Sequence, residues 1–94
     1  MTTHQATCYL LLGGGEGMLT ISAAMDQGVI ASLTIEAQDG FGGPIWAALA
    51  SSLTGVPRER EAIQARIGRF RRAGLIPEEL DLEPLVNTVL KFGV

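Results

Sequence analysis

The hydrophobic and polar positions in the first 37 residues predict three β-strands. Residues 8–12 form a short apolar run, residues 18–25 alternate in part, and residues 29–37 alternate clearly, with Ala31, Leu33 and Ile35 separated by polar residues. A glycine cluster at 13–17 and the Asp-Gln-Gly sequence at 26–28 supply the residues that chain reversals need. Because the turns are short, the three strands are predicted to form an antiparallel meander.

The second half of the chain predicts three helices. Pro44 stands where the first helix would begin and Gly55 where it would end, Pro57 is expected to open a second helix that ends at Gly74, and Asp81 is the expected N-cap of the third. Apolar residues recur every three or four positions at Ile45, Trp46, Leu49, Ala50 and Leu53, at Ile63, Ile67 and Phe70, and at Leu82, Leu85, Val86 and Val89. The predicted fold class is α+β, a three-stranded antiparallel meander followed by three helices packed on one face.

Length and composition indicate a small domain with a surplus of apolar residues. The chain has 94 residues, so we expect a single domain over 1–94. Apolar residues make up 47% of it, which is a high share for a body with so little interior. We therefore expect part of the apolar surface to face a partner.

Charge and cysteine content narrow the function classes. A net charge of −3 argues against a general nucleic-acid binder. The single cysteine, Cys8, excludes an internal disulfide and fits a reducing compartment. The first basic residue is Arg58 and every apolar run is short, so we expect a cytoplasmic protein without a signal peptide or membrane contact. The pattern predicts no regular structure around the only histidine, His4.

No residue pattern predicts catalysis, a bound cofactor or a metal site. The glycine cluster lacks the Gly-Lys-Ser/Thr sequence and the helix of a phosphate-binding loop, so it is expected to be a hairpin turn. Cys8 begins an apolar strand without a histidine or lysine nearby, which favours a buried structural thiol. We expect no catalytic, cofactor-binding or metal-binding residues in this chain.

Candidate contacts with a partner lie in two segments. Six of the seven basic residues lie between 58 and 72, where arginines either coat the solvated face of a helix or bind an acidic surface or a phosphate. Arg66 and Arg69 are the candidates there. In the glycine-rich loop before the first helix, Asp39 and Phe41 are candidates, because an aromatic residue among glycines has little reason to be buried in its own domain. Trp46 is also a candidate, although core packing explains it as well.

From Gly14 to Val94 the chain resembles the C-terminal accessory domain of lipoate–protein ligases, which is a separate small subunit in some bacteria and archaea. The likeness rests on Gly14-Gly15 before Met18-Leu19, on Gly28-Val29-Ile30, on a loop with Asp39 and Phe41, on Leu53-Thr54-Gly55, and on Arg60-Glu61-Ala62-Ile63. Two features depart from the family. The loop reads Gln38-Asp39-Gly40-Phe41 where a Gly-Asp-Phe-Phe-like sequence is common, and the usual lysine ahead of the glycine pair is missing.

The resemblance implies an accessory role in a heterodimer. In this family the large subunit binds ATP and lipoate, forms lipoyl-adenylate and transfers lipoate to a lysine of an acceptor domain. The small chain would be needed for the adenylation step and would not itself be catalytic. An alternative from another class is a small sulfur or iron–sulfur carrier that uses Cys8.

Overall fold

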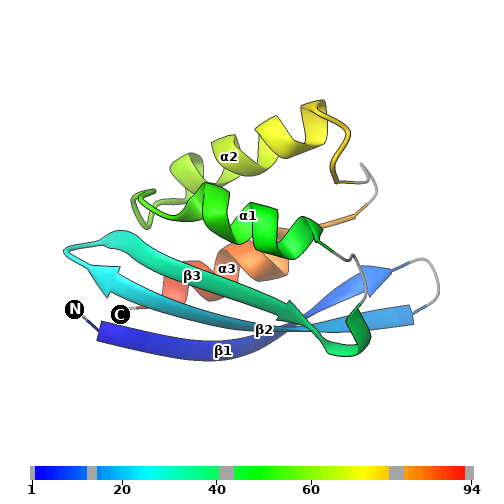
Figure 1. Cartoon of the computed structure of the whole chain (residues 1–94), viewed down its shortest axis with the longest axis horizontal. Helices are drawn as coiled ribbons and strands as arrows, with labels where there is room; N and C mark the ends of the chain where they lie inside the picture. Colours follow the sequence, from blue (N-terminus) through cyan, green and yellow to red (C-terminus); the bar gives the residue numbers. More distant parts are fainter. Residues whose placement is uncertain (1, 13–14, 41–43, 77–79, 93–94) are drawn as a thin grey trace.

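The computed structural model describes residues 2–12, 15–40, 44–76 and 80–92. Its elements in chain order are β1 (Thr2–Leu12), β2 (Gly15–Asp26), β3 (Val29–Ala37), a short 3₁₀ turn η1 (Gln38–Gly40), α1 (Ile45–Leu53), α2 (Arg60–Arg72) and α3 (Glu83–Lys91) (Figure 1). The predicted α+β class, three strands followed by three helices, is confirmed.

The sheet is an antiparallel meander in the order β1-β2-β3. Leu12 pairs with Gly15, so the glycine cluster does connect a hairpin. Asp26 pairs with Val29 across a two-residue turn, in which Gln27 has φ 53° and Gly28 has φ 79°. Two successive positive φ angles match the type I′ turn, whose twist suits paired strands.

A bulge changes the register near the start of β3. Ala24 pairs with Ser32 whereas Met25 pairs with Ile30, so Ala31 is an extra residue on β3. Extra residues of this kind bend a strand and increase its local twist. Beyond the bulge, Leu33 and Ile35 point into the core in regular alternation.

The connection between α1 and α2 pairs with the start of β3. The Ile30 N–H donates to the Val56 carbonyl at 3.0 Å, the Gly55 N–H donates to the Ile30 carbonyl at 2.6 Å, and Pro57 forms a bridge with Val29. The prediction that Pro57 opens the second helix is therefore wrong. The chain runs extended beside β3 through this segment, and α2 begins at Arg60.

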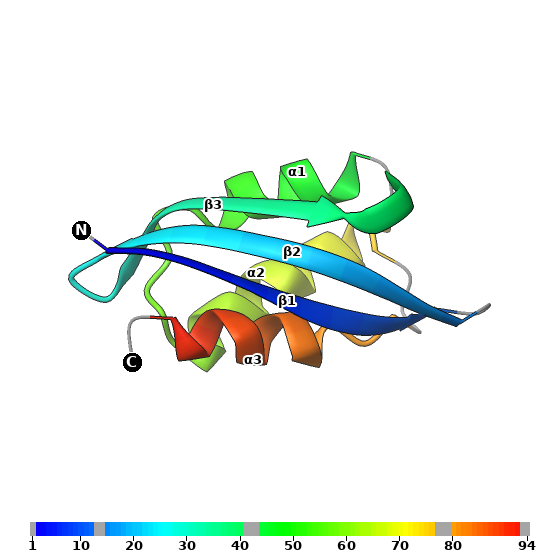
Figure 2. The ribbon, with the colours of Figure 1, turned by 90° about the horizontal axis from the view of Figure 1, so that it is seen from below.

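All three helices lie on one face of the sheet (Figures 1 and 2). Helix α1 packs on β3, α3 packs on β1, and α2 packs against both other helices. The apolar stripe predicted for α1 is confirmed, because Trp46, Leu49 and Leu53 are buried. Between the sheet and the helices, the largest fully buried side chains are Leu10, Leu19, Ile21, Ile30, Leu49, Leu53, Ile63, Leu85, Val86 and Val89.

The N-terminal residues belong to the sheet, so the expectation that His4 lies in a segment without regular structure is wrong. His4 pairs with Ala23 in the register of β1 and β2. Its ring stacks on Phe92, with 5.5 Å between ring centroids, and its Nε2 lies 3.1 Å from the Thr2 hydroxyl. The ring stack joins the beginning of β1 to the residue that follows α3.

Helix α3 begins one residue later than predicted, because Leu82 rather than Asp81 is its N-cap, although Asp81 still accepts a hydrogen bond from the first turn. The Glu83 N–H donates to the Asp81 carboxylate at 3.0 Å, and Pro84 falls within the first turn. A carboxylate at this position satisfies a backbone donor that has no partner inside the helix.

Candidate interaction surface

The outer face of the sheet, which is the face turned away from the helices, is not covered by any helix (Figure 2). Along β1, Cys8 and Leu10 point inward and are buried, so Tyr9 and Leu11 point outward by the period-2 alternation. Tyr9 is 56% exposed and Leu11 is 73% exposed. Large apolar side chains are thus presented to solvent on a regular strand.

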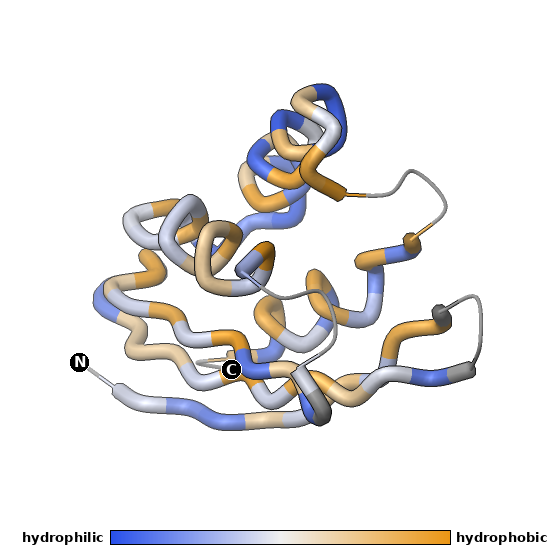
Figure 3. The backbone as a smooth tube through the Cα atoms, turned by 45° about the vertical axis from the view of Figure 1, so that its right-hand side comes forward, coloured by the Kyte–Doolittle hydropathy of each residue, from blue (hydrophilic) through white to orange (hydrophobic). Residues whose placement is uncertain are grey.

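The β1–β2 register adds a third apolar side chain to this surface. Met18 lies directly opposite Tyr9, and Glu16 lies opposite Leu11. We call Tyr9, Leu11 and Met18 the hairpin patch, because they lie at the hairpin end of β1 and β2. Figure 3 shows the hydrophobic colouring of β1 beside this hairpin. Opposite side chains on neighbouring strands are close enough to form one contact surface.

The rest of the outer face is mostly polar, and its charged residues are acidic. The cross-strand pairs along it are Thr7 with Thr20, Thr20 with Glu36, Gln5 with Ser22, and Ser22 with Thr34. Glu16 and Glu36 are exposed on β2 and β3, and neither forms an ion pair with a described residue. The first 57 residues of the chain contain no lysine or arginine. The hairpin patch therefore lies between carboxylates that have no ion pair within the described part of the chain.

One predicted loop contact, Asp39, lies near this end of the molecule. Asp39 belongs to η1, which follows β3 and contacts β2 (Figure 1). Phe41 lies outside the described residues. Trp46 is only 4% exposed and packs in the core.

The predicted arginine contacts lie elsewhere, on α2. Arg66 donates from Nη1 to the Ser52 carbonyl at 3.3 Å and thereby reaches the end of α1. The Arg69 side chain is exposed and has no hydrogen bond or ion pair to the described residues. Because α2 packs on the other two helices, the structure does not bring Arg66 and Arg69 together with Asp39.

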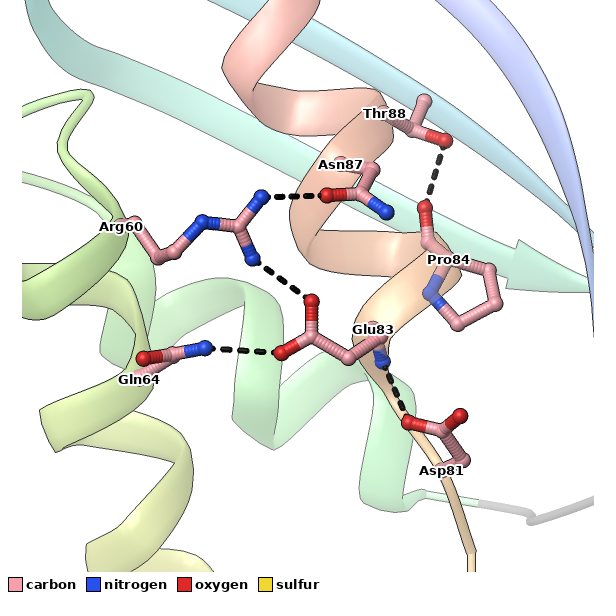
Figure 4. Close-up of polar contacts among 7 residues, drawn as sticks. All are labelled: Arg60, Gln64, Asp81, Glu83, Pro84, Asn87 and Thr88. Atoms are coloured by element: carbon pink, nitrogen blue, oxygen red, sulfur yellow. Dashed lines mark hydrogen bonds and ion pairs between the residues drawn. The ribbon is translucent and has the colours of Figure 1, made fainter.

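Other arginines connect the helices to one another. Arg60 on α2 forms an ion pair with Glu83 on α3, with 2.6 Å between Nη1 and Oε2, and also donates to the Asn87 side chain (Figure 4). Gln64 donates to the same Glu83 carboxylate at 2.8 Å. These contacts fix α2 against α3. The side chains of Arg60 and Glu83 are half-exposed, so their ion pair contributes little to stability.

Arg58 and Arg71 contact backbone carbonyl groups. Arg58 donates to the Leu90 carbonyl at 2.6 Å, near the C-terminus of α3, where a cation also interacts favourably with the helix dipole. Arg71 donates to the Leu80 carbonyl. The arginine-rich segment thus contributes contacts between elements as well as positive charge.

Cys8 is buried under α3. Burial raises the pKa of its thiol above the ordinary value of 9.0, and a hydrogen bond with Thr88 offsets part of that rise. A thiol in this environment stays protonated at neutral pH. Cys8 therefore behaves as a small buried hydrophobic residue, in agreement with the expectation from its position in an apolar strand.

Two of the open pockets on the described part of the chain lie among the helices and strands. One of about 180 Å³ lies between α2 and α3, and its polar lining includes Gln64, Arg71 and Glu83, which already make hydrogen bonds. The other, of about 420 Å³, lies between β3 and α1 and is lined by small and apolar side chains together with Glu36. Within the described ranges, no group of three or more His, Cys, Asp or Glu residues is arranged to hold a metal ion.

Comparisons with known proteins give no family assignment. No protein-family model matches the chain, and no curated protein or solved structure shows significant similarity to it. None of the helices in the described part of the chain has the length and apolar character needed to span a lipid bilayer.

Sequence reasoning missed Tyr9 and Leu11 as surface residues. The available signal was the run of four apolar residues from Tyr9 to Leu12. A strand with one covered face needs apolar residues only at alternate positions, so a continuous run leaves apolar side chains on the other face. The three helices cover only one face of the three-stranded sheet, so apolar side chains that point to the other face are exposed.

Proposed function

We propose that this chain is the non-catalytic accessory subunit of a two-chain lipoate–protein ligase. The observation that carries the proposal is the hairpin patch, an apolar surface on the uncovered face of a small domain whose order of elements resembles the accessory domain of that family. Exposed apolar patches rimmed by polar residues are typical of protein interaction sites.

The partner is the large subunit of the ligase, in the cytoplasm. ATP and lipoate bind to that subunit, and the lipoyl acceptor domain meets this chain only through the complex. Binding of the accessory chain stabilises the arrangement of the large subunit that forms lipoyl-adenylate. Such an effect requires that the accessory chain bind one state of the large subunit more tightly than the other.

The direct test is pyrophosphate release from ATP in the presence of lipoate. We expect no release by this chain alone and stimulation when it is added to the large subunit from the same source. The two chains should also co-elute at 1:1, with an interface that buries at least about 1,000 Å² in total if the complex is stable. Turnover by the 94-residue chain alone, or no stimulation by it, contradicts the proposal.

The alternative, a sulfur or iron–sulfur carrier, requires an accessible thiolate at Cys8. Burial and the raised pKa of this thiol oppose that role. Thiol labelling of the folded chain separates the two functions, because a carrier would react rapidly at neutral pH and a buried thiol would react only after the domain opens.

A further inference from the structure

We propose that the chain docks on its large subunit through the outer face of the sheet, centred on the hairpin patch, and that the surface it meets is apolar with lysine or arginine side chains around it. This inference rests on the proposed function and adds to it the docking face and the chemistry of the partner surface.

Large exposed apolar side chains are grouped at the hairpin end of the sheet. Among the described residues, the exposed large hydrophobic side chains are Tyr9, Leu11 and Leu75. Tyr9 and Leu11 lie two positions apart on one strand, with Met18 beside Tyr9, whereas Leu75 is a single residue after α2. A tyrosine among aliphatic neighbours is the kind of anchor that contributes strongly to binding.

The charge on this face identifies the chemistry of the partner. Glu16 lies opposite Leu11, and Glu36 lies in the next row beyond Tyr9 and Met18, opposite Thr20. Both carboxylates are exposed and have no ion pair with the described residues, and no lysine or arginine occurs before Arg58. Complementary potentials favour a partner with basic groups at these positions.

The same charges oppose a symmetric dimer of this chain through the sheet. A two-fold contact would bring the same acidic face of each copy together, so that no basic group would oppose its carboxylates. Like charges that face each other across an interface are unfavourable. A different protein with a basic rim fits the face better than a second copy does.

The apolar half of the test uses Tyr9→Thr with Leu11→Thr. Threonine keeps the β-propensity of the strand while it removes the large apolar side chains. We expect the affinity for the purified large subunit to fall by about 30-fold or more. The matched control is Leu75→Thr, which removes an exposed leucine from the helical side and should leave the affinity within about 3-fold of wild type. Circular dichroism establishes that both variants are folded.

The charge half of the test compares Glu16→Gln with Glu36→Gln and with the control Glu61→Gln on α2. We expect the two sheet variants to associate several-fold more slowly than wild type at low salt, and expect the difference to shrink at high salt, because salt screens exposed charges. The control should associate at the wild-type rate. Equal rates for the sheet variants and the control contradict the acidic-face inference.

The outcomes also separate this inference from the proposed function. If the wild-type chain neither binds the large subunit nor stimulates adenylation, both are overturned. If it does both and the Tyr9/Leu11 variant binds equally well, the function stands and the docking face is wrong. Loss of affinity in Phe41→Ala alone would likewise overturn the docking face, as would dimerisation of the free chain that the Tyr9/Leu11 substitutions abolish.

Discussion

The two faces of the sheet are built from the same strands and have opposite compositions. On β2, Ile21 points toward the helices and is fully buried, while the next residue, Ser22, lies in a polar row of the outer face. On β1, buried Cys8 and Leu10 alternate with exposed Tyr9 and Leu11. The inner face is selected for packing, and the outer face, which contributes little to packing, is available for recognition.

Charged residues on the helical side of the molecule and on the outer face of the sheet also differ in their contacts. On the helical side, Arg60 is held by Glu83 and Asn87, and Arg58 by a carbonyl group of α3. On the outer face of the sheet, Glu16 and Glu36 have no such partners among the described residues. The charges of Arg58 and Arg60 on the helical side therefore serve the fold, whereas the outer-face carboxylates are available to another molecule. The following predictions test this contrast.

The largest effect is expected from a truncation on the inner face. Ile21→Ala should lower the free energy of unfolding by about 2–5 kcal/mol, because it removes a fully buried side chain and leaves a cavity. Ser22→Ala, one residue along the same strand, should change it by less than about 0.5 kcal/mol. Urea denaturation of both variants provides the measurement. Similar losses for the two would show that the faces do not differ in their contribution to stability.

The sequence predicted the fold where local patterning was strong. Alternation at Leu33 and Ile35 gave β3 with its observed bounds, because one side of that strand is buried and the other solvated. The first half of β1 was missed, since its inward positions include His4 and Ala6, which give only a weak apolar signal. Their place in the sheet depends on pairing with Ala23 and Ile21. Such long-range pairing is not encoded in local periodicity.

The candidate surface was predicted in part. The excess of apolar residues indicated an exposed apolar surface, but its position depends on which face the helices cover, and that is a tertiary property. Among the candidates named from the sequence, Trp46 lies in the core, and Arg66 contacts the end of α1. Asp39 lies at the end of the sheet that also carries the hairpin patch. Residue type alone did not distinguish these environments.

The next largest effect is expected at alkaline pH and concerns Cys8. Because burial holds the pKa of this thiol above the value of the unfolded chain, the folded state favours the protonated form. The stabilisation is fully present below the ordinary pKa of 9.0 and is lost as the pH rises through the folded-state pKa. Chemical denaturation at several pH values should show a steeper alkaline loss for wild type than for Cys8→Ala. Parallel pH profiles would mean that the thiol is not buried in solution.

A smaller effect is expected from the ion pair between the helices. Arg60→Ala should cost no more than about 1 kcal/mol, since both partners are half-exposed and solvent screens the pair. Glu36→Gln, on the outer face, should leave the stability of the free chain nearly unchanged. A double-mutant cycle with Glu83→Gln isolates the coupling energy. If Glu36→Gln lowers the free energy of unfolding more than Arg60→Ala does, the outer-face carboxylates have structural partners. The charges on the two sides of the molecule would then not differ in their role.

The smallest effect on the free chain is expected from the substitutions that should most affect docking. Tyr9→Thr with Leu11→Thr removes side chains that are 56% and 73% exposed, so little buried area is lost. Loss of the cross-strand contact between Tyr9 and Met18 should lower the free energy of unfolding by roughly a few tenths of a kcal/mol. The strand preference of threonine offsets part of this loss. We therefore expect a net change within about 1 kcal/mol in urea denaturation. A loss as large as that of Ile21→Ala would show that the hairpin patch holds the sheet together, and any weaker binding by this variant would then reflect unfolding.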